Sequence, residues 1–564
     1  MLRIILVSPT HKERRDYMKM NSQYYSQLDA GGRNDNSDIF SHTEGANAVA
    51  EGIASHAEGS STIAKGIASH AEGANSIAHA DYSHVEGANT FAHGNSSHVE
   101  GNSNISYGNN SHAEGSHTIT GTSDDPMQGD SAHAEGTHTV AEGVASHAEG
   151  SSTIAKGIAS HAEGANSVAH ADYSHAEGAN TFAHGNSSHV EGNSNISYGN
   201  NSHAEGSHTI TGTSDDPMQG DSAHAEGTHT VAKGIASHAE GSNTNAYGSA
   251  SHAEGHYTTT GDSEQIFMGT GAHAEGYFTT AYGNNTHAEG YFTFAQGDNS
   301  HAEGFYTLAK GIASHAEGSH TEAEGDFTHA EGVNTQAIGD FSHTEGVGTR
   351  SKFKASHIMG KYGDAQESYS WFIGNGVASN NRELGAKWLS STRNMYIDGS
   401  TYVAGGTNYA EMFEVQNGTI DIGFFVTFEG EFIRKATNHD EYILGVTSTN
   451  PSILGNSAEM RWSEKYIVDE WGRIQYKDQF YSGILEKQAI LNPEWDASRT
   501  YISRINRPEW ISVGLLGQIR VRDDGTCSIG GYCNANAEGI ATKSQKGYKV
   551  IKRINNNQII IMFK

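Results

Sequence analysis

Several kinds of residue are scarce in this chain of 564 residues, and each scarcity removes a class of protein. There are two cysteines, Cys527 and Cys533. They could face each other in a hairpin, but nothing else indicates a disulfide framework, and we expect both to be reduced. Lys and Arg total 35 against 66 Asp and Glu, a formal net charge of −31, which excludes nucleic acid as a natural partner. No segment approaches the roughly 18 apolar residues of a membrane span.

An export signal is also missing. Residues 1–7 hold one Arg and a short apolar run, followed by Pro9 and a charged stretch at 12–16, whereas a signal peptide needs a longer apolar core. We therefore expect assembly in the cytoplasm of the producing cell without a signal peptide. Residues 21–40 combine Tyr, Gly, Asn and Asp, and we predict that residues 1–40 form an irregular cap or attachment segment, since the end of a stack of strands needs covering.

A repeated tetrad dominates what is present. His-Ala-Glu-Gly, with small variations, recurs from His42 to His343, and nearly every interval is 14 residues. A fixed short period over half of a chain is typical of a solenoid and not of a globular enzyme domain. We assign the repeat region to residues 41–346.

Three intervals of the repeat are longer, and one block is duplicated. The steps that begin at His112, His203 and His252 are 21 residues each. Their additional residues, such as Ser-Asp-Asp-Pro-Met-Gln-Gly, have turn chemistry and predict loops that protrude from one face. Residues 55–145 recur almost unchanged at 146–236, which a stack tolerates because each coil touches only its neighbours.

Each 14-residue unit predicts two short strands that end in turns. In Ser160-His161-Ala162-Glu163, side chains alternate between faces, so Ser and Ala share one face and His and Glu the other. Small residues on the inner face allow only a thin interior, which a single chain stabilises poorly. We infer that copies associate as a homotrimer. Either the His/Glu face or the second-strand face with Ile, Val and Phe would then line the seam between chains.

The regular His and Glu rows have three interpretations. The favoured one is structural, with stacked His–Glu hydrogen bonds or ion pairs that fix the register between chains. Metal binding is the second, because His and carboxylate are ligands, but metal sites are few and closed and are not repeated 21 times. A polar receptor-binding face is the third. We therefore predict neither a metal nor another cofactor.

The repeat resembles the YadA-like head repeats of trimeric autotransporter adhesins in its period, its Ser and Ala placement and its Gly. That resemblance implies a left-handed parallel β-roll. The sequence departs from it where His and Glu replace two apolar residues. The overall prediction is an all-β fold, with a β-roll solenoid, a β neck at 347–406 and a mainly-β domain at 407–564.

The C-terminal region is similar to G2-type autoproteolytic domains of tail and neck appendage proteins from phages of Gram-positive bacteria. The matching motifs lie at 408–414, 442–446, 450–452 and 513–517. The resemblance implies an intramolecular chaperone that trimerises, guides folding of the fibre and then cuts itself off. Any enzymatic activity would be a single-turnover self-cleavage.

The same resemblance implies a cleavage site where this domain begins. Glu411 is the candidate acid/base, and the scissile bond lies near Thr407–Asn408. Thr407 offers a hydroxyl nucleophile, and Asn408 offers attack through its own amide. The alternative is that Tyr409 to Glu414 is an ordinary strand. His439 and Asp440 are candidate assistants, with a purely structural role favoured.

These patterns favour a homotrimeric phage or prophage tail appendage, or a surface adhesin fibre, that attaches to a host surface. The expected partners are copies of the chain itself, a bacterial surface receptor such as a glycan, and other virion proteins. The expected location is the virion or an extracellular surface. A glycan depolymerase and a passive spacer are the alternatives, although no unique carboxylate pair marks a glycosidase site.

Overall fold

The computed structural model describes residues 40–125, 127–216, 218–265, 267–398, 405–458, 462, 464–481 and 484–564. Nearly all of the predicted N-terminal cap lies outside these residues. The chain divides into two compact units, residues 1–399 and 400–564. Its fold is all-β, as predicted, and within the described ranges the one helix is the three-residue 3-10 helix η1 (Arg504–Asn506). No helix of the described residues is long and apolar enough to cross a membrane.

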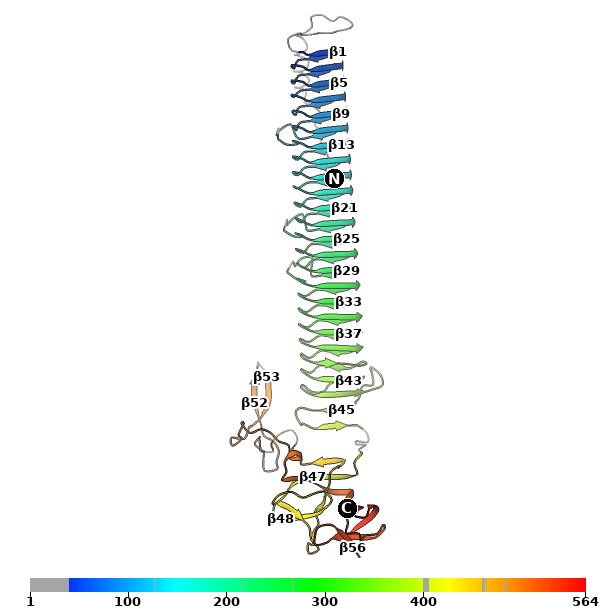
Figure 1. Cartoon of the computed structure of the whole chain (residues 1–564), viewed down its shortest axis with the longest axis vertical. Helices are drawn as coiled ribbons and strands as arrows, with labels where there is room; N and C mark the ends of the chain where they lie inside the picture. The colour runs from blue at the N-terminus through cyan, green and yellow to red at the C-terminus, as the bar shows by residue number, and fades with distance from the viewer. Residues whose placement is uncertain are drawn as a thin grey trace. The chain divides into compact units, whose positions relative to one another are not determined.

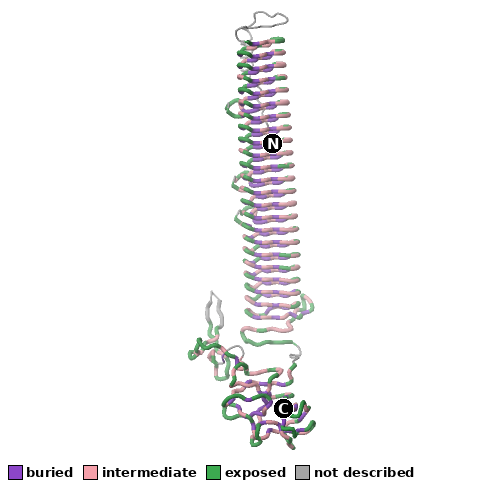
Figure 2. The backbone as a smooth tube through the Cα atoms, viewed as in Figure 1, coloured by how far each residue is buried: buried purple, intermediate pink, exposed green. Residues whose placement is uncertain are grey.

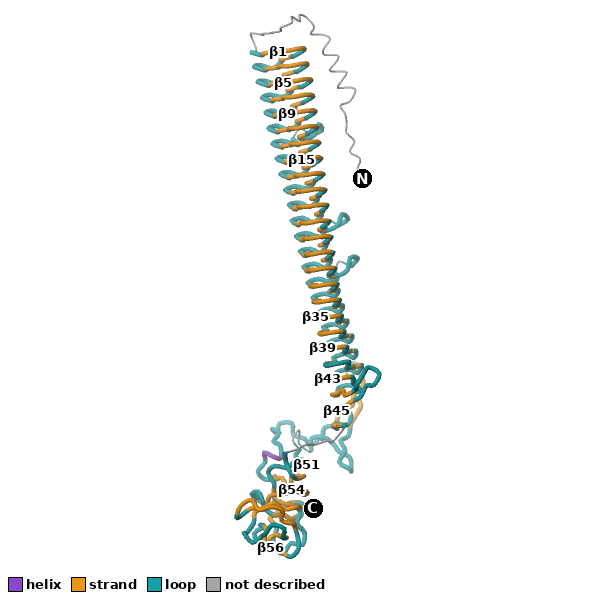
Figure 3. Tube along the Cα trace, turned by 90° about the vertical axis from the view of Figure 1, so that its right-hand side faces the viewer, coloured by secondary structure: helices purple, strands orange, loops and turns teal. Residues whose placement is uncertain are grey.

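The first unit is a stack of parallel strands (Figures 1 and 3). Each odd-numbered strand begins at a repeat histidine and ends four residues later, from β1 (His42–Ala46) to β39 (His329–Val333), and the shortened β41 (His343–Thr344) follows. Neighbours pair in register, so His42 lies opposite His56. A second row of two-residue strands begins seven residues after each histidine, from β2 (Val49–Ala50) to β42 (Arg350–Ser351). Each 14-residue unit therefore forms one coil with two strands.

The two faces of the strand are those that the alternation predicted, and the Ser/Ala face is the inner one. Ser160 and Ala162 are buried, whereas His161 and Glu163 are only half-buried. The Ser160 hydroxyl donates to the Gly157 carbonyl at 2.8 Å, which satisfies this buried group. Figure 2 shows the resulting buried line along every coil. Because Ala, Ser and Thr fill most of it, the interior is thin and offers little apolar burial per coil.

The glycine of the tetrad is required by its backbone and by its neighbour. Gly164 has φ of +105°, and a Cβ there would stand 2.1 Å from the carbonyl oxygen of Gly178 in the next coil. Only glycine adopts this conformation without strain, and only glycine permits the close approach.

The three longer intervals form loops that leave the stack undisturbed. β11 (His112–Ser116) pairs with β13 (His133–Thr137) in register although 21 residues separate them. The additional residues bulge out between two glycines that lie against each other, since a Cβ on Gly129 would reach the Cα of Gly121 at 2.3 Å. The loops project from one side of the stack (Figures 1 and 3), as predicted.

The stack extends beyond residue 346, where the tetrad ends. β43 (His357–Lys361) pairs in parallel with β41, and β44 (Trp371–Asn375) pairs in parallel with β43. The antiparallel strands β45 (Leu384–Trp388) and β46 (Met395–Ile397) then close it. The region predicted as a neck at 347–406 thus begins with two further coils. These coils lack the His-Ala-Glu-Gly tetrad, because Ile358 and Phe372 fill the interior positions that Ala occupies in most other coils.

The second unit contains a mostly antiparallel ten-stranded sheet, in which β47 and β51 lie beside the main path β49-β48-β50-β54-β58-β57-β55-β56. Its core gathers Phe425, Val446, Ile519, Ile559 and Ile561. The two cysteines are free and buried. A separate hairpin joins β52 (Tyr476–Tyr481) to β53 (Ile484–Ala489). The strands of the sheet are β47 (Asn408–Glu414), β48 (Phe425–Glu429), β49 (Phe432–Lys435), β50 (Gly445–Thr447), β51 (Ile453–Gly455), β54 (Trp510–Arg522), β55 (Tyr532–Ala535), β56 (Ala541–Ser544), β57 (Tyr548–Asn555) and β58 (Gln558–Phe563).

Candidate functional site

The predicted cleavage segment leads into strand β47. This strand pairs in antiparallel fashion with β54 and in parallel fashion with the short β51. Its register with β54 shifts between Tyr409 and Ala410, two residues after the predicted scissile bond. A shift of this kind bends a strand locally and changes where its side chains point. The segment is therefore held on both sides, with an irregularity close to the bond of interest.

The main chain of Gln518 binds both reactive groups of Thr407. The Thr407 hydroxyl donates to the Gln518 carbonyl at 2.7 Å. The Gln518 N–H donates to the Thr407 carbonyl at 3.1 Å. The hydroxyl singled out from the sequence and the carbonyl of the predicted scissile bond are thus fixed by one residue. The N–H also stands where it can stabilise negative charge on that carbonyl oxygen.

Asn408 is buried on the opposite face of the same strand. Its side-chain amide donates to the Ser448 hydroxyl at 3.3 Å. Its own carbonyl accepts from the Ser452 N–H at 2.8 Å. The carbonyl that an Asn408 amide attack would use is therefore also polarised by a backbone donor.

Two glycines of β54 make room for this segment. A Cβ on Gly514 would stand 2.7 Å from Nδ2 of Asn408, and a Cβ on Gly517 would stand 2.5 Å from the Thr407 carbonyl oxygen. The motif at 513–517, singled out from the sequence, therefore lies directly against the Thr407–Asn408 peptide. Any larger residue at either position would displace it.

Glu411 lies on the face of β47 that Tyr409 shares, and the two side chains bind each other. The Tyr409 hydroxyl donates to the Glu411 carboxylate in a short hydrogen bond. This bond to the carboxylate is the main cause that raises the pKa of Tyr409. Among the described residues, no hydrogen bond joins Glu411 to Thr407 or Asn408. The structure thus brings Thr407 and Asn408 to one peptide and places Glu411 with Tyr409.

Sequence reasoning did not identify Tyr409, Ser448, Ser452 and Gln518 as members of this site. Tyr409 and Ser452 belong to motifs that were noticed, so their proximity to the site was detectable in principle. Ser448 and Gln518 carry no signal of their own, because one contributes a common hydroxyl and the other contributes only its main chain.

Asp440 holds the loop after β49 in place. Its carboxylate binds the Arg434 guanidinium at 2.9 and 2.7 Å, and it accepts from the Thr437 N–H at 2.7 Å. The arginine is the main cause that holds the pKa of Asp440 far below its usual range. A carboxylate so strongly bound is a poor proton acceptor, in keeping with the structural role that the sequence favoured.

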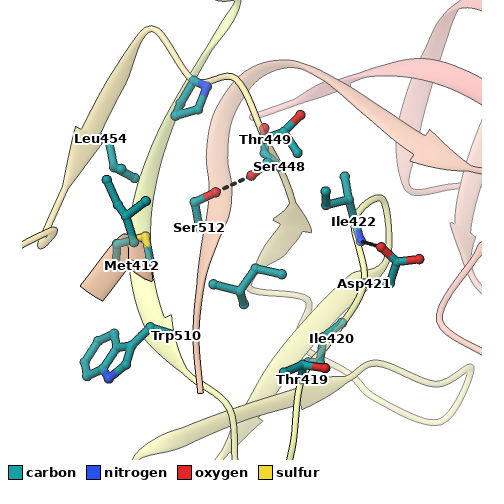
Figure 4. Close-up of a pocket in the computed structure, with 13 residues that line it drawn as sticks. Met412, Thr419, Ile420, Asp421, Ile422, Ser448, Thr449, Leu454, Trp510 and Ser512 are labelled. Carbon is teal, nitrogen blue, oxygen red and sulfur yellow. Dashed lines mark hydrogen bonds between the residues drawn. The ribbon is translucent and has the colours of Figure 1, made fainter. Parts of the chain in front are cut away.

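A pocket of about 530 Å³ opens beside the same face of β47 as Asn408. Figure 4 shows Met412 and Ser448 on its wall, with the Ser512 hydroxyl bound to the Ser448 carbonyl. Ile420, Ile422 and Trp510 supply apolar lining, and Asp421 is its carboxylate. Because Ser448 both lines the pocket and contacts the Asn408 amide, the pocket reaches the neighbourhood of the predicted cut.

The histidine rows of the first unit form a second cluster of titratable groups. Rings of successive coils stack, as for His133 and His147 at 4.8 Å between centroids and 3° between planes. In most coils, Nε2 lies 3.7–4.0 Å from the glutamate two residues on, as for His133 and Glu135. Burial, followed by the neighbouring ring, lowers the pKa of His133. The lowered pKa disfavours the charged ring of His133, and its Nε2 has no hydrogen-bond partner among the described residues.

The stacked geometry also bears on metal binding. Ligand atoms of His203, Glu205 and His224 lie within 4.8 Å of one another. Zinc requires bonds of about 2.0–2.1 Å to histidine nitrogen, and parallel stacked rings direct their nitrogens alongside each other, so they do not converge on one ion. The rows are better explained as a stacking element than as a chain of metal sites.

Comparison with known proteins identifies the C-terminal region. Residues 361–558 match the family described as Peptidase_G2, IMC autoproteolytic cleavage domain. This region is therefore a G2-type domain, and the match begins within the last coils of the stack. The pre-neck appendage protein of Bacillus phage B103 is 37% identical over 164 residues, which are 28% of this chain and 19% of that protein. The phage-related protein YobO of Bacillus subtilis (strain 168) is 35% identical over 177 residues, 29% of this chain and 21% of that protein.

A solved structure shows the same extent of similarity. The C-terminal fragment of bacteriophage phi29 gene product 12 is 32% identical, covering 28% of this chain and 100% of the fragment, with a TM-score of 0.25. The chain spans about a fifth of the length of the curated relatives it matches.

Proposed function

We propose that this chain is a homotrimeric appendage protein of a phage or prophage that attaches to a bacterial surface, and that its C-terminal domain acts as a self-cleaving chaperone. The observation that carries the proposal is the G2-type domain at the end of a long repeat stack. The matching relatives are named as pre-neck appendage proteins. We infer a location in the virion, with other virion proteins and a surface receptor, such as a glycan, as partners.

The composition of the stack supports association of several copies. Its interior holds mainly Ala, Ser and Thr, so apolar burial within one chain is small. The second strands present Val, Ile or Phe outward, half-buried, in every coil from Ile63 to Val231. A continuous apolar row of this length on a chain with net charge −31 is suited to contact between chains. A left-handed trimeric β-roll is the arrangement we propose.

Cleavage by the Thr407 route follows from the Gln518 contacts. The Thr407 hydroxyl reaches its own carbonyl carbon only through a strained four-membered ring, so water is the nucleophile here, and the hydroxyl, bound to the Gln518 carbonyl, positions the peptide. The water oxygen attacks the carbonyl carbon of Thr407, the C–N bond to Asn408 breaks, the Asn408 nitrogen takes a proton from that water, and Thr407 keeps the new carboxyl group. The Gln518 N–H stabilises the oxyanion that forms on the way.

The Asn408 route breaks the next bond along. The side-chain nitrogen attacks the carbonyl carbon of Asn408 and forms a cyclic imide, and the amine of Tyr409 leaves with a proton. The two routes give C-terminal fragments that begin at different residues, Asn408 or Tyr409. Intact mass distinguishes them, because the fragments differ by one asparagine.

We assign Glu411 the acid/base role, working together with Tyr409, which holds its carboxylate. Tyr409→Phe frees the carboxylate, whereas Glu411→Gln removes its basicity with little change in size. If Glu411 is the base, we expect Glu411→Gln to lower the rate of cleavage by 10²–10⁴-fold, the range of general acid–base catalysis.

The deciding experiment is the intact mass of freshly purified full chain, with light scattering on the same sample. Wild type, Thr407→Ala, Asn408→Ala and Glu411→Gln are compared, and Glu414→Gln, at the far end of β47, serves as the matched control. The proposal expects a fragment starting at Asn408 in wild type and control, strongly reduced in Glu411→Gln and slowed in Thr407→Ala, on a trimeric stalk. An uncut chain in every sample would refute self-cleavage, and a monomer would refute the trimer.

A further inference from the structure

The coils of the stack are so alike that they do not determine how neighbouring copies align along the axis. Outward-facing His and Glu recur in each coil from His56 to Glu331, and the block at 55–145 recurs at 146–236. A copy displaced by one coil, about 4.8 Å, would meet nearly the same chemistry. Strands without distinctive partners are prone to such slippage. A trimer of these stacks needs an additional element to fix its register.

One stretch of the stack differs from all earlier coils. Seven aromatic residues occupy the last position of successive first strands or the turn position that follows it, where the preceding coils carry Ala, Ser, Thr, Asn or His. We call this group the aromatic edge. Its members are Tyr257, Tyr277, Phe278, Tyr291, Phe292, Phe305 and Tyr306.

The rings of the aromatic edge form two stacked rows. Phe278 and Phe292 have centroids 4.8 Å apart and planes 11° apart, and Phe292 stacks on Tyr306 at 4.9 Å. The rows meet edge to face, as in Phe305 and Tyr306 at 75°. Ring faces are thus covered within the chain, while ring edges remain outside. Tyr257 is 44% exposed and Phe305 is also 44% exposed.

The backbone gives an independent reason to regard these residues as selected for contact. Tyr257, Phe278, Phe292 and Tyr306 have φ between 54° and 56°, a conformation that bulky residues rarely adopt and that Asn tolerates. The backbone preference of bulky residues for negative φ is therefore overridden in four successive coils. Violations of this kind mark sites where another requirement prevails.

The aromatic edge begins where the other apolar row is interrupted. The outward position of the second strand is Val231 in one coil, and it becomes Asn245, Thr259 and Thr280 in the next three. Apolar residues return to that position at Phe294 and Leu308, so three coils without them coincide with the start of the aromatic edge. The aromatic edge therefore distinguishes these coils from all others along the stack.

We propose that the aromatic edge packs against neighbouring copies of this chain and fixes their axial register. The proposal rests on the homotrimer proposed above. The spacing of the rings indicates what packs against them. The rings repeat once per coil, and another parallel stack of this chain repeats at the same distance along its axis, so the two can stay in contact over several coils. Ring edges that face outward are suited to pack against rings of such a neighbour.

The test uses the full chain and interchain distances. Two versions, one with Ile158→Cys and one with Ile235→Cys, are co-expressed with different affinity tags, and mixed assemblies are spin-labelled. Both positions are exposed, at 47% and 46%, at the same place in coils five steps apart. The native thiols are buried and do not compete for label. A slip of one coil changes the distance between labels at different heights by several Å.

The test variant combines Tyr257→Asn, Phe278→Asn, Phe292→Asn and Tyr306→Asn, which suits the backbone and preserves each coil. The control combines Tyr82→Asn, Tyr173→Asn, Phe327→Asn and Phe341→Asn. These four are exposed aromatics with φ between 57° and 59° in the other turn of the coil.

We expect one narrow distance in wild type and control. In the test variant we expect additional longer and shorter distances, or loss of the assembly. A test variant that keeps the single narrow distance overturns the proposal. If that variant also loses binding to bacterial cells, the aromatic edge faces a receptor and not a neighbouring copy. A monomeric wild type would refute the homotrimer and not the register argument alone.

Discussion

The imidazole rings of His315 and His329 stack face to face, with centroids 4.7 Å and planes 3° apart, although they lie one coil apart in the chain. The same contact recurs along the stack and ends with His343 and His357 at 4.5 Å. A protonated ring is therefore held beside another histidine, and two positive charges on neighbouring rings would repel each other.

We expect the stack to lose stability in acid. Burial, followed by neighbouring histidines, lowers the pKa of several rings below the ordinary 6.5, and that of His343 to about 4. The unfolded chain then binds protons more readily than the folded chain, so stability is complete above pH 6.5 and falls as the pH drops toward 4. Thermal melting between pH 4 and 8 measures this. The C-terminal unit, whose single histidine is His439, is the internal reference. Constant melting of the stack over that range would contradict the expectation.

Gly164→Ala should break the stack locally. The substitution combines an unfavourable φ of +105° with a Cβ 2.1 Å from a neighbouring carbonyl oxygen. The backbone part alone costs about 1–2 kcal/mol, and the clash adds to it. Gly418→Ala is the matched control, with φ of +90° and nothing within 4 Å. Limited proteolysis should cut the Gly164→Ala chain near that coil. Equal protease resistance in both variants would show that the coil accommodates the added Cβ without unfolding locally.

Two buried hydroxyls in one coil should respond in opposite ways to removal. The Ser188 hydroxyl donates to the Gly185 carbonyl at 2.7 Å, so Ser188→Ala should lose about 1 kcal/mol. The Thr181 hydroxyl is buried and has no hydrogen-bond partner within the described residues. Thr181→Val should therefore leave stability unchanged or raise it by up to about 1 kcal/mol. Denaturation of both variants beside wild type is the measurement, and a destabilised Thr181→Val would reveal a partner in the assembled protein.

Deletion of residues 146–236 should give a folded, shorter stack. The residues at both ends of the block match, so Ala145 joined to Ser237 restores the normal coil sequence. Six coils disappear, about 29 Å at the strand spacing. Electron microscopy measures the length, and binding to bacterial cells shows whether this block is a spacer or contributes to recognition. Unchanged binding favours the spacer, and weaker binding assigns contacts to the deleted coils.

Much of the first unit was accessible from the sequence because its rules are local. The alternation in Ser160-His161-Ala162-Glu163 separated the Ser/Ala face from the His/Glu face, and the 14-residue step indicated the pairing. The last coils were missed because Ile358 and Phe372 replace Ala while the step is kept. The face-to-face stacking of histidine rings between coils was also missed, since it depends on how each ring is turned toward its neighbours.

The candidate site was harder to predict because it is assembled from distant strands. The sequence placed Thr407, Asn408 and Glu411 in one segment, and alternation along β47 was enough to separate Asn408 from Glu411. The contacts of Thr407 with the main chain of Gln518, 111 residues away, follow from the pairing of β47 with β54. Pairing between such distant segments has no local signal.

The closed necks of the three loops have a consequence for how this protein can change. Gly121 and Gly129 lie against each other, and the strands on either side keep their pairing as though the residues between them were absent. Loop length and composition can therefore vary without altering the coils, because closing a loop twice as long costs only about 0.6 kcal/mol more. Each loop is a display position on a fixed scaffold, where new peptide sequences can be grafted and selected independently of folding.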